Sequence, residues 1–570
     1  MCGISGRIGT NVVPKLINDL KVLEYRGYDA AGVGIVKHGK ISVTKVKGSV
    51  SKLKLNTATT FGIAHTRWAT HGKVSKANAH PHVSKNGKWA IVHNGIIENA
   101  DELKKELAGV EFKSQTDSEV IAQLLGKYGN GVTAISKVSK MLKGSFAVVA
   151  INVDFPDTLF VMRRFSPLYL YRDKDKVIAS SDTLTFDKVK YVELKDGDYG
   201  YVTMQDTYLW DENDSRVTRS ELVLDIPKIN LPDRYFKHHM LKEIFDTPTC
   251  INNIIEYYKN WTLDVDLSKY VNIKLIGCGT AYHTAVMGAR FLQELTGKEC
   301  SAYIANEFEN EHLPINKKTL YIFVSQSGET ADTLKCMYLL KNKGCKLIVI
   351  TNKPNSTMSK VAHIVLPMLA GTEVAVASTK AYTCGVAVLY LMAYYFKFGN
   401  TDKAIVKLTK LKKYIVELLE NKFEDVNKIY KLKSCFFVGK GYDYITAMEG
   451  NLKLKEITYI NCQAFASGEL KHGTLALIDK KSVVFAINTN SELSDALMNN
   501  INEIKARGGK VIILNSVKGV KGDINFKHID TKLDGLLIMV YLQQLAYYTS
   551  VRKKINPDKP RNLAKSVTVV

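Results

Sequence analysis

The second half of this chain repeats itself, and the duplication limits the possible folds more than any other feature of the sequence. A constant shift along the chain aligns Gly277-x-Gly279 with Gly439-x-Gly441, and it gives twelve identities across positions 277–307. A shift only two positions longer aligns the apolar runs LIVI and VIIL further along. Self-similarity at a fixed spacing indicates two copies of one supersecondary unit. We therefore expect two related domains in this half of the chain.

Strand-like and helical segments alternate through both copies, whereas the first part of the chain is richer in strands. The runs IKLIGCG, LYIFVSQ, KLIVITN and HIVLPM alternate with helical stretches, which is typical of a parallel sheet covered by helices. Earlier in the chain, GIAHTRWAT, KWAIVHNG, GSFAVVAINV, TLFVMRR and DYGYVTM follow one another, with helices expected only near 14–25 and 118–125. This is an α+β pattern. The acidic, proline-punctuated segment 211–232 resembles a linker.

Composition and charge exclude several classes of protein. The 570-residue chain has a net charge of +23, but most of its 79 basic residues are Lys, and they form no block of like charge. Because Arg dominates base recognition, this dispersed excess predicts no nucleic-acid partner. The nine Cys show no C-x-x-C pair and no His at metal spacing, which predicts a reducing compartment and no metal.

Two further observations set the expected location. The start of the sequence lacks the pattern of a signal peptide. The longest apolar run, 385–396, is shorter than the ~20 residues that a spanning helix needs, so it predicts a buried core helix. We expect a cytoplasmic protein without a membrane partner.

The first copy contains a candidate anion site. The strand-like run LYIFV leads into Ser325-Gln-Ser-Gly-Glu-Thr330 and then into an amphipathic stretch. Hydroxyl groups and free N–H groups at a helix start beside the end of a strand hold anions well, and we expect a phosphate there. A helix cap without a ligand is the alternative. The corresponding stretch of the second copy, FAINTNSE, lacks the Ser-x-Ser pair, so only one copy should bind phosphate well.

The second copy contains a candidate acid–base cluster. Glu449, Lys453 and Glu456 are spaced i, i+4 and i+7, which places them on one helix face, and His472 follows in GELKHG. Carboxylate, amine and imidazole groups together can perform general acid–base chemistry on a sugar. Taken alone, a Glu–Lys pair at this spacing is more often a solvated ion pair.

The start of the chain offers a candidate nucleophile. Removal of the initiator Met would make Cys2 the first residue, with a thiol and its own α-amine as a nearby base. By itself this is weak evidence, because many chains begin with Met-Cys.

These motifs carry a family resemblance that covers essentially the whole chain. The segments MCGISG, EYRGYDAAG, HTRWATHG, NAHPH, HNGIIEN and QTDSEV resemble the glutaminase domain of N-terminal-nucleophile (class II) glutamine amidotransferases. The segments HMLKEIFDTP, GCGTAYH, SQSGETADT, VASTKAY, LKLKEITYI, GELKHG and PRNLAKSVTV resemble the sugar-isomerase (SIS) half of the glucosamine-6-phosphate synthases. More than a dozen motifs in family order make the resemblance highly specific.

The resemblance implies a fold and a division of the chain. It implies an N-terminal-nucleophile glutaminase of sandwiched antiparallel sheets, followed by two doubly wound α/β SIS domains with parallel sheets. The implied segments are a glutaminase domain at 1–215, a linker and lead-in helix at 216–264, SIS domains at 265–400 and 401–550, and a catalytic tail at 551–570.

The resemblance also implies a reaction and its partners. In this family a terminal Cys releases ammonia from glutamine, and the ammonia crosses an internal channel to fructose 6-phosphate. The products are glucosamine 6-phosphate and glutamate, the first step of hexosamine synthesis. No metal, nucleotide or organic cofactor is required, and the implied assembly is a homodimer.

In the glutaminase half, the resemblance implies roles for individual residues. Cys2 resembles the nucleophile, and Asn94 with the Gly95 N–H resembles the oxyanion hole. Arg67 is implied to pair with the glutamine α-carboxylate and Asp117 with its α-ammonium group. The positions that resemble pocket and gate residues are Trp68, Thr70, His71 and His80.

In the isomerase half, the phosphate-binding positions match Ser325, Gln326, Ser327 and Thr330. Glu456 resembles the base that moves a proton between C1 and C2, and His472 the ring-opening residue, which the neighbouring subunit contributes in this family. Lys565 matches the lysine that forms a Schiff base, so we expect it to be partly buried with a lowered pKa. The remaining matched positions are Lys453, Glu449, Val376, Ser378 and Ala564.

One position departs from the family pattern. The glycine loop usually reads C-G-T-S, but this chain has Ala281 in place of the Ser. A hydroxyl that contacts the sugar is therefore missing, and Thr280 or a water would have to replace it. We expect a weaker but working site.

Three alternatives remain open at this point. The same machinery could act on another phosphosugar, as the Ala281 departure allows. A phosphoribosyl-pyrophosphate amidotransferase would share the first half but would lack the internal repeat. A non-catalytic sugar-phosphate sensor would need only the SQSGET loop, and the presence of Cys2, Glu456, His472 and Lys565 together disfavours it.

Overall fold

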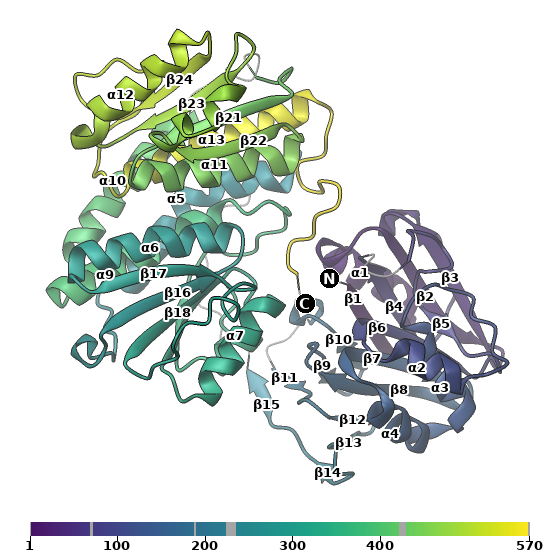
Figure 1. Cartoon of the computed structure of the whole chain (residues 1–570). Helices are drawn as coiled ribbons and strands as arrows, with labels where there is room; N and C mark the ends of the chain where they lie inside the picture. The colour runs from purple at the N-terminus through teal and green to yellow at the C-terminus, as the bar shows by residue number, and fades with distance from the viewer. Residues whose placement is uncertain (1, 69–71, 187–189, 224–234, 421–428, 568–570) are drawn as a thin grey trace. The chain divides into compact units, whose positions relative to one another are not determined.

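A computed structural model describes residues 2–68, 72–186, 190–223, 235–420 and 429–567 of the chain (Figure 1). The chain forms two compact units, the first comprising Met1–Asp225 and Ser566–Val570 and the second Ile226–Lys565. Each unit has its own sheets and its own hydrophobic core.

The first unit contains two antiparallel sheets. The eight-stranded sheet has the order β15-β11-β9-β10-β1-β4-β2-β3, formed by β1 (Gly3–Gly9), β2 (Ala30–Lys37), β3 (Lys40–Lys47), β4 (Phe61–Arg67), β9 (Tyr169–Arg172), β10 (Lys176–Ser180), β11 (Lys190–Glu193) and β15 (Glu221–Val223). The seven-stranded sheet has the order β14-β13-β12-β8-β7-β6-β5, formed by β5 (His82–Val83), β6 (Trp89–Ile97), β7 (Gly144–Asn152), β8 (Phe155–Arg164), β12 (Tyr199–Val202), β13 (Thr207–Trp210) and β14 (Arg216–Val217).

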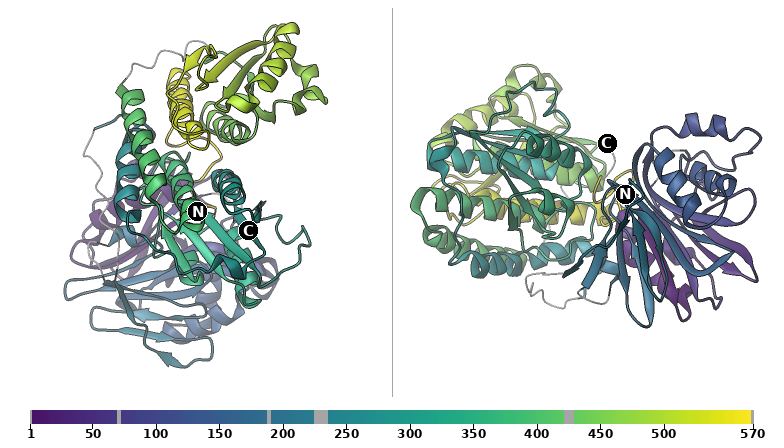
Figure 2. Two further views of the ribbon diagram at one scale, coloured as in Figure 1. Left: turned by 90° about the vertical axis from the view of Figure 1, so that its left-hand side faces the viewer. Right: turned by 90° about the horizontal axis from the view of Figure 1, so that it is seen from below.

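Alternation along the strands arranges this unit in layers. In β7, Ala147 and Val149 belong to the core cluster that the two sheets share, whereas Phe146 and Val148 belong to the cluster under the helices. Successive side chains of a strand point to opposite faces, so each sheet has two buried faces. Helix α1 (Val12–Leu23) covers the first sheet, and the helices that cover the second are α2 (Ala100–Glu106), α3 (Glu119–Tyr128) and α4 (Gly131–Met141) (Figure 2).

The structure corrects two expectations for this unit. Besides the two predicted helices it contains α2 and α4, where no helix was expected. The segment 211–232 is not a linker at its start, because Asp211 and Ser215 close the turn between β13 and β14, and β15 pairs with β11. The first unit therefore extends past residue 215, and the rest of the expected linker, 224–232, lies outside the described residues.

The second unit contains two five-stranded parallel sheets with the same strand order. The first, β17-β16-β18-β19-β20, is formed by β16 (Asn272–Gly277), β17 (Glu299–Ile304), β18 (Thr319–Ser325), β19 (Leu347–Thr351) and β20 (Ile364–Pro367). The second, β22-β21-β23-β24-β25, is formed by β21 (Ser434–Gly439), β22 (Asn461–Ala466), β23 (Val483–Asn488), β24 (Lys510–Asn515) and β25 (Ile524–Asn525).

The predicted repeat is confirmed element by element. The shift that aligns Gly277 with Gly439 also carries both ends of β16, β17 and helix α6 (Thr280–Thr296) onto those of β21, β22 and helix α11 (Tyr442–Thr458). Both helices follow a glycine with positive φ, 57° at Gly279 and 59° at Gly441. Only glycine adopts such a conformation readily, which explains why this glycine pair is present in both copies.

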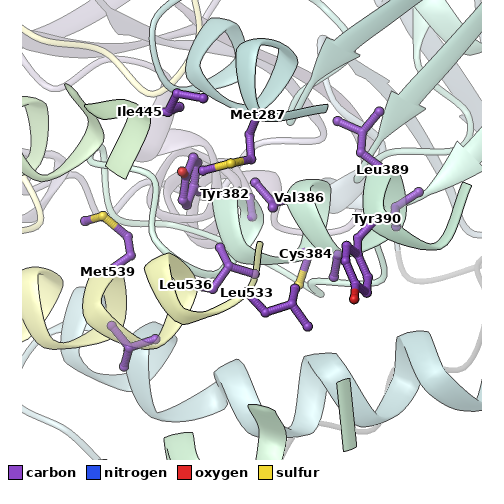
Figure 3. Packing of buried hydrophobic residues seen from close by; sticks show 14 of the residues in the cluster. Met287, Tyr382, Cys384, Val386, Leu389, Tyr390, Ile445, Leu533, Leu536 and Met539 are labelled. Atoms are coloured by element: carbon purple, nitrogen blue, oxygen red, sulfur yellow. The ribbon is translucent and has the colours of Figure 1, made fainter. Parts of the chain in front are cut away.

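Helices cover both sheets and join them through one core. They are α5 (His239–Tyr258), α7 (Ala331–Asn342), α8 (Thr357–Val361), α9 (Lys380–Phe398), α10 (Asp402–Glu420), α12 (Ser491–Ala506) and α13 (Asp534–Arg552). Figure 3 shows Met287 and Tyr382 of the first copy in one cluster with Ile445 and Met539 of the second. The apolar run 385–396 lies in α9 and is buried along most of its length, as predicted. Among the described residues, no helix is long and apolar enough to cross a membrane.

Candidate active sites

The first site lies around Cys2, at the start of β1 in the first unit. The backbone N–H of Trp68 donates to the Cys2 sulfur at 3.2 Å, and the thiol reaches the Trp68 carbonyl oxygen at 3.6 Å. The Asn94 side-chain amide donates to the Cys2 carbonyl oxygen at 2.8 Å. The ends of β1 and β4 and the middle of β6 therefore bring together three residues that are far apart in the sequence.

The Cys2 thiol is held in its neutral form. Burial raises its pKa, while the Trp68 N–H and the Arg67 guanidinium group act in the opposite direction. A thiol with a raised pKa is a poor nucleophile until a base removes its proton. Any reaction at this sulfur therefore needs a base close by.

Asn94 and Gly95 are held firmly on β6. The Asn94 side-chain oxygen lies 3.2 Å from the His65 ring nitrogen Nε2, which orients the amide toward Cys2. Gly95 has a φ of 129°, and a Cβ atom at this position would lie 2.0 Å from the Ser145 carbonyl oxygen. Only glycine fits here, because any side chain would push β6 away from β7.

The two residues expected to bind the ends of glutamine are both buried and both act on the Cys2 thiol electrostatically. Arg67 donates to the Lys73 carbonyl oxygen at 3.3 Å, and the Asp117 carboxylate accepts from the Ile97 N–H at 2.8 Å. Two further predicted residues, Thr70 and His71, lie outside the described residues.

His80 belongs to a buried group of imidazole rings. Its ring centroid lies 4.1 Å from that of His65 and 4.6 Å from that of His82. Neither His80 ring nitrogen has a hydrogen-bond partner among the described residues. Burial lowers its pKa well below the ordinary value, so the ring is neutral.

The predicted phosphate loop lies between β18 and α7 of the second unit. The Ser325 hydroxyl accepts from the Gly328 N–H at 3.1 Å, and the Ser327 hydroxyl accepts from the Glu329 N–H at 3.2 Å. The Thr330 hydroxyl lies 3.3 Å from that of Ser325, while Gln326 is half-buried at the turn. The loop is thus ordered by its own hydroxyl groups at the start of a helix, where an anion is favoured.

The predicted charged face of α11 is buried rather than solvated. The Lys453 ammonium group lies 3.0 Å from Glu456 and 3.5 Å from Glu449, and its side chain is 1% exposed. Burial raises the pKa of Glu456, which Lys453 partly opposes. A buried carboxyl with a raised pKa beside an ammonium group can accept and return a proton near neutral pH.

Two residues of the first copy contact this face of α11, and neither contact was expected from the sequence. The Thr280 hydroxyl donates to Glu449 at 3.1 Å, and the His283 ring nitrogen Nδ1 lies 2.7 Å from the same carboxylate. Both residues stand in the first turn of α6, beside the predicted glycine loop. Thr280 is one expected replacement for the hydroxyl missing at Ala281, but its own hydroxyl hydrogen is directed to Glu449.

Lys565 is buried in the second unit, with 3% of its side chain exposed, and its ammonium group pairs with the Glu373 carboxylate. The tail that carries it is anchored through Asp558. The Asp558 carboxylate accepts the backbone N–H groups of His239 and Met240 at 2.9 and 2.8 Å, at the start of α5. Its carbonyl oxygen accepts the Val376 N–H at 3.1 Å.

Two of the predicted sugar-contacting residues, Val376 and Ser378, lie on the loop that also carries Glu373, the partner of Lys565. Ser378 donates to Glu373 at 3.1 Å, and Val376 is bonded to the tail through Asp558. Ala564 precedes Lys565 and is half-buried. Glu373 and Asp558 were not singled out from the sequence, because neither lies in a motif and each meets its partners only through tertiary packing.

His472 does not join this cluster within its own chain. It follows a short 3-10 turn at Glu469–Lys471, and its side chain is exposed. Its ring makes no hydrogen bond to any described residue, although its backbone N–H donates to the Glu469 carbonyl oxygen at 3.0 Å. Among the predicted isomerase residues, the structure places Glu449, Lys453 and Glu456 in one cluster, and it places Ser378 and Lys565 on Glu373.

Comparisons with known proteins match both parts of the chain that carry the candidate sites. The glutamine amidotransferase domain family matches residues 65–188, and the SIS domain family matches residues 266–395 and 428–521. Glutamine–fructose-6-phosphate aminotransferase [isomerizing] of Fusobacterium nucleatum is 40% identical, and that of Bacillus subtilis is 38% identical, each over 100% of both chains.

Solved structures are similar to the second unit. The C-terminal domain of glucosamine-fructose-6-phosphate aminotransferase from Francisella tularensis matches 57% of this chain and 99% of its own, with a TM-score of 0.51 and 33% identity. A putative phosphosugar isomerase from Silicibacter pomeroyi matches 56% of this chain and 100% of its own, with a TM-score of 0.50 and 18% identity, and shows the fold alone.

Proposed function

Because the chain belongs to the glutamine–fructose-6-phosphate aminotransferase (isomerizing) family, we propose that it transfers the amide nitrogen of glutamine to fructose 6-phosphate. The products are glutamate and glucosamine 6-phosphate. The first unit releases ammonia, the second unit aminates and isomerises the sugar, and the ammonia passes between them through an internal channel.

The glutaminase step uses Cys2 as its nucleophile. After removal of Met1, the α-amine of Cys2 takes the thiol proton, which burial otherwise holds on the sulfur. The sulfur attacks the glutamine amide carbon, ammonia leaves, and water hydrolyses the thioester. Asn94 and the Gly95 N–H stabilise the oxyanion, and Arg67 and Asp117 hold the two charged ends of glutamine.

The sugar step uses both copies of the second unit. The loop Ser325–Thr330 binds the phosphate, and Lys565 forms an imine with the open-chain ketose. Ammonia then adds to C2 of this imine and displaces the Lys565 amine. Glu456 carries a proton from C1 to C2, while Lys453 and Glu449 hold it in place. Val376, Ser378 and Ala564 surround the sugar.

The observation that carries the proposal is the burial of Lys565 close to the acid–base pair of α11. The Lys565 charge acts on Glu456, which also receives the Lys453 ammonium group at 3.0 Å. A sensor that only binds a sugar phosphate would not need a buried amine and a buried acid–base pair in one place.

The direct test is to incubate the purified protein with glutamine and fructose 6-phosphate and to measure glucosamine 6-phosphate. Absence of product with both glutamine and free ammonia would refute the synthase activity. Formation of product from a different ketose phosphate, at a higher kcat/KM, would instead favour the alternative sugar.

Two variants separate the half-reactions. Cys2→Ala should abolish the use of glutamine while synthesis from ammonia continues. Lys565→Arg should remove synthesis and spare glutaminase activity, because Arg cannot form the imine. If Cys2→Ala removes both activities equally, Cys2 has a structural role instead.

The proposal includes a homodimer in which each active site receives His472 from the partner chain, because this ring is exposed and makes no hydrogen bond to the described residues of its own chain. Co-expression of His472→Ala with Lys565→Arg tests it. Mixed dimers would contain one complete site, so activity should return to about a quarter of the wild-type value. The nine free cysteines fit a cytoplasmic, reducing compartment.

A further inference from the structure

We propose that Glu373 is a catalytic base and acid for imine formation, accepting the proton that Lys565 must lose before its amine attacks the ketose. This inference rests on the proposed role of Lys565. It assigns a reaction step to a residue of the loop between β20 and α9 that no sequence motif singled out.

Glu373 and Lys565 form a buried pair. The Glu373 carboxylate is fully buried, the Lys565 side chain is 3% exposed, and the two are in direct contact through the Glu373 oxygen Oε2. A buried ammonium group has little access to water as a proton acceptor. Glu373 Oε2 is therefore the acceptor that the structure places on the reacting nitrogen.

The two oxygens of the Glu373 carboxylate have different partners. Oε1 accepts the backbone N–H groups of Thr379 and Ala381 at 2.9 and 3.2 Å, which fixes the carboxylate at the start of α9. Among the described residues, Oε2 receives two side chains, Lys565 and the Ser378 hydroxyl at 3.1 Å. One oxygen thus anchors the group, and the other is available for a proton.

Glu373 is the counter-ion of Lys565, because the other charged groups around this pair are either paired elsewhere or neutral. Lys380 is fully buried and has its own partner in Asp246 at 3.2 Å, and Lys453 is paired on α11. Glu456 also feels the Lys565 charge, but it is paired with Lys453. Glu243 is buried, and burial together with the Glu373 charge raises its pKa to about 8. Glu243 is therefore mostly protonated near neutral pH and cannot neutralise Lys565.

In the proposed step, the Lys565 ammonium group gives a proton to Glu373 Oε2, and the neutral amine forms a bond to C2 of the open-chain ketose. The carbonyl electron pair moves to oxygen, which takes the proton from Glu373. Glu373 then removes a second proton from nitrogen and returns it to the hydroxyl group, which leaves as water. The product is a protonated imine, and Glu373 ends as a carboxylate.

The test is borohydride trapping of the imine in the full-length enzyme. Wild type and Glu373→Gln are mixed with fructose 6-phosphate and sodium borohydride, and the reduced adduct on Lys565 is measured by mass spectrometry over time and pH. Gln keeps an oxygen for the Thr379 and Ala381 N–H groups but cannot accept a proton. The trapping rate near neutral pH should fall by about 10²-fold or more.

The pH profile distinguishes a base from a structural partner. In Glu373→Gln solvent hydroxide must take the proton from the amine, so the trapping rate should rise about tenfold per pH unit. The wild-type rate should be nearly flat over the same range. Glu309→Gln is the matched control, because it removes a carboxylate from the exposed Lys335 pair in the same copy, and it should trap like wild type.

Three results would overturn the inference. These are an unchanged trapping rate in Glu373→Gln, an unchanged pH profile, or a higher KM for fructose 6-phosphate with unchanged trapping at saturation. If Glu373→Gln fails to fold, Glu373→Ala replaces it, and wild-type trapping rates in that variant would refute the proposal. Failure of the wild type to trap any imine would refute the role of Lys565 itself, a different outcome.

Discussion

The two copies in the second unit share a backbone but not a chemistry. Helices α6 and α11 have the same length and follow the same glycine turn at equivalent positions of the repeat. At two equivalent buried positions, α6 has Met287 and Phe291, whereas α11 has Glu449 and Lys453. The same helix therefore packs as ordinary core in one copy and as a charged face in the other.

The difference shows what a buried charged face requires. Buried charges are tolerated only when they are paired and hydrogen-bonded. In α11 the three charged residues pair with one another, and α6 adds Thr280 and His283 to Glu449. The copy without the charges thus supplies the polar groups that allow the other copy to keep them.

The loops after the third strand of each copy differ in a complementary way. The pairing of Phe323 with Ile276 and of Ala486 with Val438 makes Ser325 equivalent to Asn488. Asn488 is bonded internally to Ser494 and Asn515 at 3.0 and 2.9 Å. The end of β23 is therefore held by side chains of α12 and β24.

A carboxyl group closes the second loop from the helix side. Asp443, which is equivalent to Ala281, accepts the Thr489 N–H at 2.8 Å and the Thr489 hydroxyl at 2.5 Å. Ala281 has no polar side chain to offer to the corresponding loop of the first copy. The second loop is thus filled from the helix side by a carboxyl group that the first copy lacks at Ala281.

The largest expected effect follows from removing the cation of the charged face. Lys453→Met leaves Glu449 and Glu456 buried without their shared partner. We expect a loss of about 3–5 kcal/mol in unfolding free energy, together with loss of synthase activity. Urea denaturation of the full chain measures the first and product formation the second.

The matched control gives helix α11 the residues that α6 has at the two equivalent positions. Glu449→Met combined with Lys453→Phe replaces the charges by the residues of α6, and it should recover most of the stability lost in Lys453→Met without restoring synthesis. A double variant that is less stable than Lys453→Met would contradict this account of the two helices.

The next largest effect is expected at the phosphate loop, and the equivalent loop of the second copy serves as the comparison. Ser325→Ala should raise KM for fructose 6-phosphate by about tenfold, because a hydrogen bond to a charged group contributes about 1.5–3 kcal/mol. Asn488→Ala should leave KM unchanged and cost about 1–3 kcal/mol of stability, since it leaves buried polar groups unpaired. Steady-state kinetics and thermal unfolding of both variants provide the measurement, and a raised KM in Asn488→Ala would show that the second loop also binds sugar phosphate.

A pH-dependent effect should follow from Asp443. Burial raises the pKa of this carboxyl group to about 7, against an ordinary value of about 3.9 in the unfolded chain. The folded state therefore holds a proton that the unfolded state has released, so its stability contribution is present below about pH 4 and is lost as the pH rises toward about 7.

Asp443→Asn removes this titration but keeps an oxygen for the Thr489 N–H. The urea midpoint of the variant should decrease less than that of the wild type between about pH 4 and about pH 7. Equal decreases in the two proteins would show that Asp443 is ionised throughout.

The smallest expected effect comes from Ala281→Ser, which restores the hydroxyl that the family pattern has at this position. One neutral hydrogen bond contributes about 0.5–1.5 kcal/mol, so KM for fructose 6-phosphate should fall by about two- to tenfold. Unchanged kinetics of fructose 6-phosphate would exclude a role for this position.

Much of the fold was predictable because its signals are local or repeated. Apolar periodicity predicts strands β16, β18, β19 and β20 and the helix at 385–396, and sequence identity at a fixed shift predicts the duplication. Helix α2 was missed because it has only seven residues. Helix α4 is as long and as amphipathic as the predicted helix α3, so its pattern could have been recognised. The turn at Asp211–Ser215 was not distinguished from a linker, because its composition is that of any polar loop.

The sequence by itself determined the family, the repeat and the identity of most candidate site residues, since each lies in a short motif. Only the tertiary structure decided which charges are buried and with what partners. Spacing within a helix places Glu449, Lys453 and Glu456 on one face, but it does not say whether that face meets water. Glu373 and Lys565 are 192 residues apart, and a contact over that distance follows from the packing of the tail, loop and helices rather than from any local pattern.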